Sequence, residues 1–247
     1  QRLEARSGEL APAARATGTS VEVRELFFAT PARRKFLKSE ATELAHCIEA
    51  VRRHALTRPD VAFSVWHEGK LVQQWRRASA EQRVRDVLHD EFVAGSREVS
   101  LELGVLRIRG RAGLPEAARS RADQQYVYVN GRYVRDRLIA HGVRSAYEDV
   151  LHGAKQPSYV LFIDIAPSLV DVNVHPTKIE VRFRDAREVH QAVQLSLGRT
   201  VAVKLLKNFH RVYLRPFIIP HSVSVPLLLR SLCIMYLPQK LMVSLMA

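Results

Sequence analysis

The Asn130-Gly131 dipeptide constrains the fold of this chain more than any other local feature. It lies in QYVYVNGRYVR, residues 125–135, between runs of alternating aromatic and β-branched residues. A tight two-residue hairpin needs positive φ at both central positions, which Asn and Gly tolerate best. We therefore predict a β-hairpin here, and a sheet large enough to contain it.

Strands and helices are expected on both sides of this hairpin. Apolar alternation predicts a strand at 20–28 and a hairpin over 61–75 that turns at Glu68-Gly69. It also predicts a strand pair over 101–110 that turns at Gly104 and a buried strand at 159–165. Two further strands are expected over 170–184, interrupted at His175-Pro176. Helical spacing predicts one helix starting at Thr30-Pro31, with an apolar stripe from Leu37 to Ala55, and further helices at 79–88, 136–151 and 186–197. This order indicates an α+β fold in two pieces.

Composition changes after Arg199. Residues 189–247 contain no Asp or Glu and seven Lys and Arg, so this segment supplies +7 of the net charge of +13, and residues 1–188 carry +6. All three methionines lie in the last thirteen residues, and the chain starts with Gln1. We expect a chain without its native beginning and a tail, residues 200–247, that is disordered or non-native. No apolar stretch approaches the ~20 residues that a membrane span needs, so no membrane is expected.

Familiar enzyme signatures are absent from the sequence. It contains no GxxxxGK[ST], no GxGxxG after a strand and no HExxH. The ten histidines show no paired ligand spacing, and the two cysteines, Cys47 and Cys233, form no CxxC pattern. A bound metal, a zinc site and a disulfide scaffold are therefore not expected.

Three segments resist a purely structural interpretation. Gly18-Thr19 precedes a strand and then a helix start that carries Arg33, Arg34 and Lys35, although cations there oppose the helix dipole. The alternative is a solvated basic face.

Arg137, His141 and Arg144 lie at i, i+4 and i+7, on one face of the helix that follows the hairpin. Such a stripe suits a phosphate backbone, or it is again a solvated face. In the third segment, 173–178, a proline breaks the strand pattern and Lys178 presents a mobile charge suited to phosphate. The alternative is an ordinary surface lysine on a kinked strand.

Three blocks of sequence together resemble a known family. GTSVEVRELFFATPARRKFL, QYVYVNGRYVRDRL and VDVNVHPTKIEVRF are similar, in order and spacing, to signatures of MutL-type DNA mismatch-repair proteins. The resemblance covers about residues 1–197. It implies the end of a Bergerat-type (GHKL) ATPase domain over residues 1–78, then a ribosomal-protein-like domain over 79–199.

The resemblance also implies roles for individual residues. Gly18 and Thr19 would line the adenine end of an ATP site, and Asn173 and Lys178 would approach the nucleotide from the second domain, with Lys178 at the γ-phosphate. Arg137, with His141 and Arg144 beside it, would face DNA.

In the family, ATP with Mg²⁺ closes a homodimer on double-stranded or mismatched DNA and engages mismatch-recognition and downstream repair proteins. A cytoplasmic, nucleoid-associated protein is expected.

The family's catalytic glutamate, its magnesium-binding asparagine and its DNGxG motif do not occur in this sequence. Phosphoryl transfer depends on such positioning and metal groups, so we expect no ATP hydrolysis by this chain alone. Two alternatives remain open: another GHKL ATPase, such as a type II topoisomerase subunit, and a stand-alone nucleic-acid-binding module.

Overall fold

The computed structural model divides the chain into two compact units, Gln1–Val51 and Arg52–Ala247. It describes residues 2–4, 9–12, 14, 19–151, 153–174 and 179–209. Helices and strands occur in both units, and the second contains a mixed sheet with helices. The α+β class expected from the sequence is confirmed. Each unit is described below by itself.

Among its described residues, the first unit contains two short strands, a short helix and the beginning of a long one. β1 (Arg2–Glu4) and β2 (Glu9–Ala11) pair antiparallel, and α1 spans Pro31–Arg34. The strand expected over 20–28 is wrong: residues 19–24 have no regular structure, and 25–29 form a turn. Val21 and Phe28 are 85% and 71% exposed. An alternating segment becomes a strand only when a neighbour accepts its hydrogen bonds, and no described segment of the chain forms a ladder with this one.

The single long helix expected from Pro31 is two helices. Pro31 does occupy the first helical position, but the Thr30 side chain makes no capping hydrogen bond and α1 ends at Arg34. A second helix, α2 (Glu40–Thr57), then starts from a new cap. There the Ser39 hydroxyl is hydrogen-bonded to that of Thr42 at 2.8 Å, and the Lys38 amide donates to Glu43 at 2.9 Å. Local side-chain hydrogen bonds of this kind compete with a continuous helix.

A five-stranded sheet in the order β5-β6-β9-β7-β8 forms the centre of the second unit. Its strands are β5 (Ser96–Leu103), β6 (Leu106–Gly113), β7 (Gln125–Val129), β8 (Arg132–Val134) and β9 (Tyr159–Asp164). The two hairpins predicted within this sheet are confirmed. Asn130 and Gly131 have φ of 49° and 75°, and Gly104, at the β5–β6 turn, has φ of 54°. β7 and β9 are parallel, because the connection between them crosses over through a helix.

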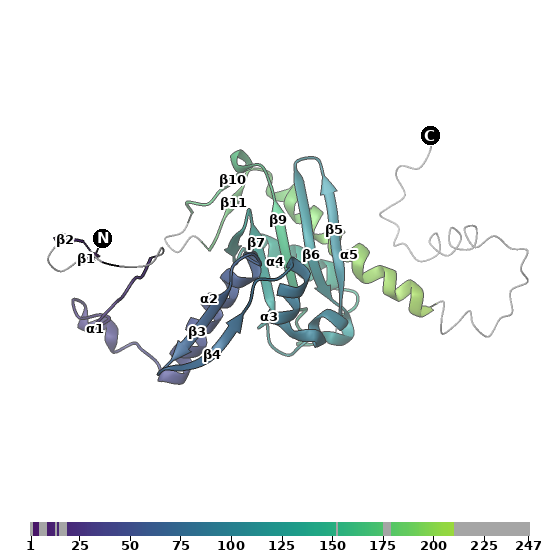
Figure 1. The fold of residues 1–247 in the computed structure, drawn as a ribbon. Helices are drawn as coiled ribbons and strands as arrows, with labels where there is room; N and C mark the ends of the chain where they lie inside the picture. The colour runs from purple at the N-terminus through teal and green to yellow at the C-terminus, as the bar shows by residue number, and fades with distance from the viewer. Residues whose placement is uncertain are drawn as a thin grey trace, which may run out of the picture. The chain divides into compact units, whose positions relative to one another are not determined.

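Two helices, α4 (Arg137–Tyr147) and α5 (Ala186–Phe209), lie on one face of this sheet (Figure 1). Asp136 caps α4 by accepting hydrogen bonds from the amides of Leu138 and Ile139 at 2.9 and 3.1 Å. The buried core between sheet and helices includes Val99, Ile108, Val127, Ile139, Val143, Leu161, Ile163, Val193 and Leu197. α5 continues beyond its predicted end at Leu197 to Phe209. The rest of the predicted tail lies outside the described residues.

Gly142 brings α4 and α5 close together. A Cβ atom at this position would lie 3.0 Å from the carbonyl oxygen of His190 and 3.3 Å from Val193. With a larger residue the neighbouring atoms would have to shift by a few tenths of an ångström, since that approach is closer than ordinary van der Waals contact.

The remaining elements follow the sequence pattern, except that the last two strands are shorter than expected. β3 (Phe63–His67) and β4 (Lys70–Trp75) form the predicted hairpin, and α3 (Ala80–Ala94) starts at Ser79, whose hydroxyl accepts from the Gln82 amide. The 3₁₀ turns η1 (Pro115–Ala117) and η2 (Pro167–Leu169) connect strands. Among the described residues of the two strands expected over 170–184, β10 (Val170–Asp171) and β11 (Arg182–Phe183) are in strands. Residues 175–178 lie outside the described residues.

A buried arginine joins four segments of the second unit. Arg83 of α3 is fully buried, and its guanidinium donates to the carbonyl oxygens of Ala55, Pro59, Val61 and Arg76 at 3.0, 3.2, 2.8 and 2.6 Å. These carbonyls belong to the end of α2, the turn after it and the residue that follows β4. Burial lowers the pKa of Arg83, whereas Asp86 and Asp60 raise it. The cation is thus compensated by backbone dipoles, which fix α3 against the preceding hairpin.

We predict that Arg83→Met lowers the free energy of unfolding by about 3–5 kcal/mol, because the carbonyls lose their donors. Arg85→Met is the matched control on the same helix. Its side chain is 39% exposed and pairs with Asp90 at the surface, so its loss should cost less than about 1 kcal/mol. Urea unfolding measures both, and equal losses would contradict the role assigned to Arg83.

We also predict that Gly110→Ala destabilises the sheet more than Gly104→Ala. Both glycines have positive φ, but a Cβ at Gly110 would collide with the carbonyl oxygen of Val160, whereas Gly104 faces open space. Gly104→Ala should cost about 1–2 kcal/mol of backbone strain, and Gly110→Ala an additional ~1–3 kcal/mol of overpacking. Thermal or urea unfolding of the two variants tests this, and a smaller loss for Gly110→Ala would refute it.

Candidate nucleic-acid interface

The outward face of α4 carries the three residues singled out from the sequence. Arg137, His141 and Arg144 are exposed, whereas Ile139 and Val143 on the opposite face are each 1% exposed in the core. The helix therefore presents its basic stripe to solvent because its apolar stripe is held against the sheet.

A second helix contributes to this face, which the sequence analysis did not foresee. His190 of α5 approaches His141, with 2.7 Å between His190 Nε2 and His141 Nδ1 and 4.9 Å between the ring centroids. Arg187, one turn earlier on α5, is also exposed. The two histidines are separated by 49 positions in sequence, so no local spacing could have indicated the pair. We call Arg137, His141, Arg144, Arg187 and His190 the α4–α5 basic face.

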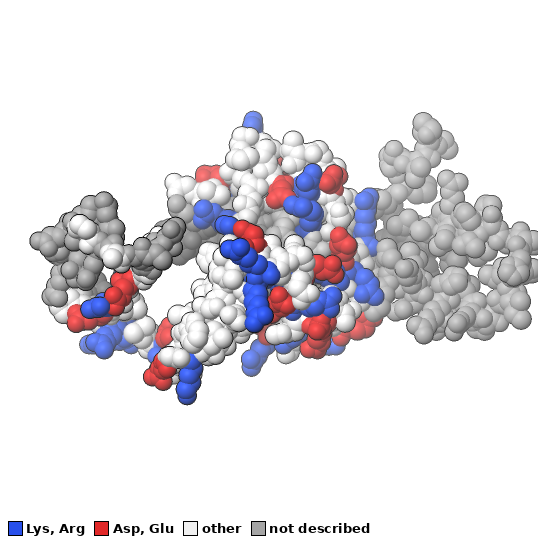
Figure 2. All heavy atoms as spheres, viewed as in Figure 1, with Lys and Arg blue, Asp and Glu red and all other residues white. Residues whose placement is uncertain are grey.

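The arginines of the α4–α5 basic face are not neutralised by carboxylates. Within the described part of the chain, Arg137 and Arg144 take part in no ion pair. The opposite face of the sheet differs: Arg107 pairs with Glu102 at 2.8 Å, and Arg109 with Asp164 at 2.7 Å. In the view of Figure 2, basic and acidic side chains likewise lie interspersed over the described surface.

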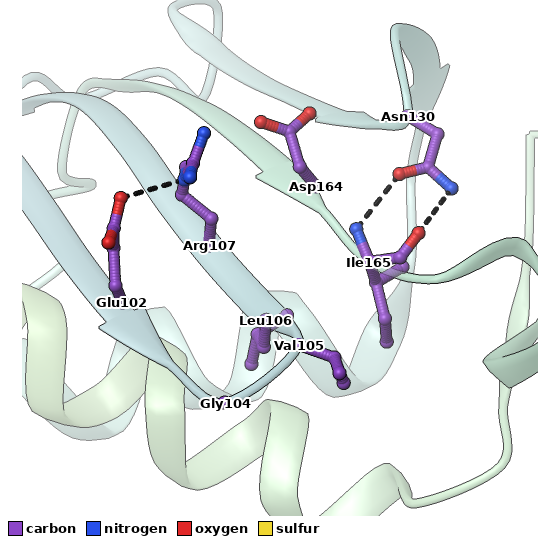
Figure 3. Close-up of a pocket in the computed structure, with 8 residues that line it drawn as sticks. All are labelled: Glu102, Gly104, Val105, Leu106, Arg107, Asn130, Asp164 and Ile165. Atoms are coloured by element: carbon purple, nitrogen blue, oxygen red, sulfur yellow. Dashed lines mark hydrogen bonds and ion pairs between the residues drawn. The ribbon is translucent and has the colours of Figure 1, made fainter.

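A small pocket lies at one end of the sheet. It has a volume of about 240 Å³ and is lined by Glu102, Gly104, Val105, Leu106, Arg107, Asn130, Asp164 and Ile165 (Figure 3). Its polar side chains already have partners: Glu102 pairs with Arg107, Asp164 pairs with Arg109, and Asn130 exchanges two hydrogen bonds of 2.9 Å with the backbone of Ile165. Ligand sites are usually larger and present free polar groups, so this pocket is a feature of the turns.

Two of the four predicted nucleotide contacts lie among the described residues. Thr19, in the first unit, is exposed, and Asn173, in the second, is exposed with its amide donating to Asp171 at 2.8 Å. Gly18 and Lys178 lie outside the described residues. The described residues contain no cluster of three or more His, Cys, Asp or Glu that could hold a metal. In the same part of the chain, no helix is long and apolar enough to cross a membrane.

Two buried tyrosines near the end of α4 are structural. Tyr147 donates to the carbonyl oxygen of Gly113 at 2.6 Å. Burial raises the pKa of Tyr147 and of Tyr159 well above the ordinary value for a phenol. Both therefore stay neutral, and neither supplies a charge to the surface.

Comparison with known proteins identifies relatives of this chain. The family described as DNA mismatch repair protein, C-terminal domain, matches residues 84–202. DNA mismatch repair protein MutL of Ralstonia nicotianae is 57% identical over 199 residues, which cover 79% of this chain and 31% of that protein. MutL of Janthinobacterium sp. is 54% identical over 193 residues, covering 78% of this chain and 32% of that protein. The chain thus spans about a third of the length of these relatives.

A crystal structure of the N-terminal domain of a DNA repair protein has a similar fold, with a TM-score of 0.64 at 24% identity over 74% of this chain and 60% of that one. The two sequence blocks around the Asn130-Gly131 hairpin and Asn173 lie within the region that the mismatch-repair family matches. This chain belongs to the MutL-type family of DNA mismatch-repair proteins.

Proposed function

We propose that this chain serves mismatch repair by contacting the sugar–phosphate backbone of duplex DNA through the α4–α5 basic face. In the whole protein, ATP binding and hydrolysis would close a homodimer on DNA, and mismatch-recognition and downstream repair proteins would join it. We place that protein in the bacterial cytoplasm, associated with the nucleoid.

The observation that carries this proposal is the uncompensated charge on the outward face of α4. Arg137 and Arg144 are exposed on a helix whose opposite face is fixed in the core, so their positions along the surface are set by the helix. Arginine and histidine donors in a row suit phosphate oxygens, and phosphate contacts hold a protein on DNA without reading its sequence. The binding should therefore be electrostatic and independent of sequence.

A nucleotide role remains a proposal from the family resemblance. Gly18, Thr19, Asn173 and Lys178 are the proposed ATP contacts, with Lys178 at the γ-phosphate. The described residues offer two of these, Thr19 and Asn173, and no acidic cluster suited to Mg²⁺. They do not make a complete nucleotide site, and no chemical step is assigned to this chain.

The two alternative functions considered from the sequence, a topoisomerase subunit and a nucleic-acid-binding module, are not equally well supported. Identity of 57% to a MutL protein favours mismatch repair over a topoisomerase subunit. A stand-alone nucleic-acid-binding module would use the same basic face. A full-length protein in which ATP changes DNA affinity would support the mismatch-repair role, and one in which ATP has no effect would favour the module.

We predict that Arg137→Glu weakens duplex binding and lowers the slope of log affinity against log salt by about one unit, because one phosphate contact is lost. Fluorescence anisotropy with a labelled duplex at several salt concentrations measures both quantities. Two unrelated duplex sequences should give the same result.

The matched control is Arg77→Glu, which makes the same charge change in the exposed loop between β4 and α3. It alters the net charge equally but should leave the salt slope within experimental error. If the two variants behave alike, or if Arg137→Glu binds as the parent does, the α4–α5 basic face is not the DNA site.

A further inference from the structure

The His141–His190 pair joins α4 and α5 at the surface of the second unit. The ring nitrogens His141 Nδ1 and His190 Nε2 lie 2.7 Å apart, which is hydrogen-bond distance. Because Gly142 holds the helices close beside the pair, the two rings are kept together by the core packing. His141 is exposed and His190 half-buried, so solvent protons reach the pair.

The hydrogen bond fixes how many protons the pair carries in each state. One inner nitrogen must donate and the other accept, since a neutral imidazole has one donor and one acceptor. In the neutral pair, the two outer nitrogens, His141 Nε2 and His190 Nδ1, are then always one donor and one acceptor. Adding one proton from solvent converts the outer acceptor into a donor and keeps the inner bond. A second proton would leave no inner acceptor and break it.

A single proton therefore changes what the pair offers to an anion. The neutral pair presents one N–H and one lone pair, and that lone pair repels a phosphate oxygen. The singly protonated pair presents two N–H donors and a positive charge, and hydrogen bonds from an ionised donor to phosphate are the stronger kind. Within the described residues, no protein group is bonded to the outer nitrogens.

The charges around the pair couple this proton to an anion. Arg137 and Arg144 lie four residues before and three residues after His141 on α4, and Glu148 follows the end of that helix. Arg187 lies three residues before His190 on α5, and the sheet is on the other side of both helices. A phosphate on the face would attract the added proton and would contact both new N–H donors.

We infer that the His141–His190 pair is a proton-dependent phosphate contact, so that this chain takes up a proton when it binds duplex DNA. The inference rests on the proposed function of the same face and adds its regulation. Linkage is reciprocal: if DNA favours the protonated pair, lower pH favours DNA binding. Affinity should rise as pH falls within pH 5–8, the range in which imidazoles change charge.

The test is isothermal titration calorimetry of the full chain with a duplex at pH 7, in buffers of different ionisation enthalpy. We expect an uptake of about one proton per chain, and an affinity that changes by up to about tenfold per pH unit. His141→Gln and His190→Gln should each abolish most of that uptake, and each should keep the salt slope supplied by the arginines to within one unit. His46→Gln, at an exposed histidine of α2 in the first unit, is the matched control and should leave the uptake unchanged.

The outcomes separate this inference from the proposed function. Binding that depends on Arg137 but takes up no proton overturns the inference and leaves the DNA site standing. So does a proton uptake in both histidine variants that equals that of the unmodified chain. An absence of duplex binding at every pH overturns both. Circular dichroism confirms that each variant is folded, and the proton uptake of the unmodified chain decides the question even if one variant does not fold.

Discussion

The close contact of α4 with α5 at Gly142 determines how the second unit presents itself to solvent. A Cβ atom there would lie only 3.0 Å from the His190 carbonyl oxygen, so glycine lets the helices approach without a shift of either. With the helices so close, Ile139 and Val143 are held in the core between the helices and the sheet. That burial fixes the rotation of α4 about its axis and turns the other side of the helix outward. The basic face is thus a consequence of core packing, because the rotation of the helix decides which residues point to solvent.

Arg83 imposes a comparable constraint where α3 meets the preceding hairpin. A buried cation is costly unless it is compensated. Here four backbone carbonyls accept hydrogen bonds from Nη1 and Nη2 of Arg83 in place of a carboxylate, whereas its buried Nε has no partner among the described residues. Because those carbonyls come from three segments, the guanidinium fixes their mutual positions more strictly than apolar packing would. Tyr128 extends the connection from the sheet, since its hydroxyl donates to the Arg53 carbonyl at 2.9 Å. The end of α2 is therefore held to both α3 and the sheet.

Local pattern predicted those elements whose causes are local. The Asn130-Gly131 turn and the apolar face of α4 were both predictable, because turn chemistry and helical spacing act over a few residues. The strand expected at 20–28 was wrong, since a strand also needs a partner that alternation cannot supply. The His141–His190 pair was missed for the same reason, because it depends on tertiary packing. At the candidate site, sequence could name the residues of α4 but not their neighbours on α5.

The distribution of charge matters more for DNA binding than its sum. The chain carries a net charge of +13, but arginines of the exposed sheet face are paired with Glu102 and Asp164. Cations that are already paired attract a phosphate only weakly. The α4–α5 basic face supplies only a few unpaired cations. A few phosphate contacts give a weak complex, of the order of 10⁻⁴–10⁻⁶ M for non-specific binding at physiological salt. Under the proposed function, a single face would therefore hold DNA only briefly. Two copies on one duplex would make the second contact intramolecular, which raises the overall affinity without any new contact. Closure of a dimer would then act as the switch between brief and lasting binding of DNA. A proton shared by His141 and His190 would adjust the DNA affinity of each face separately.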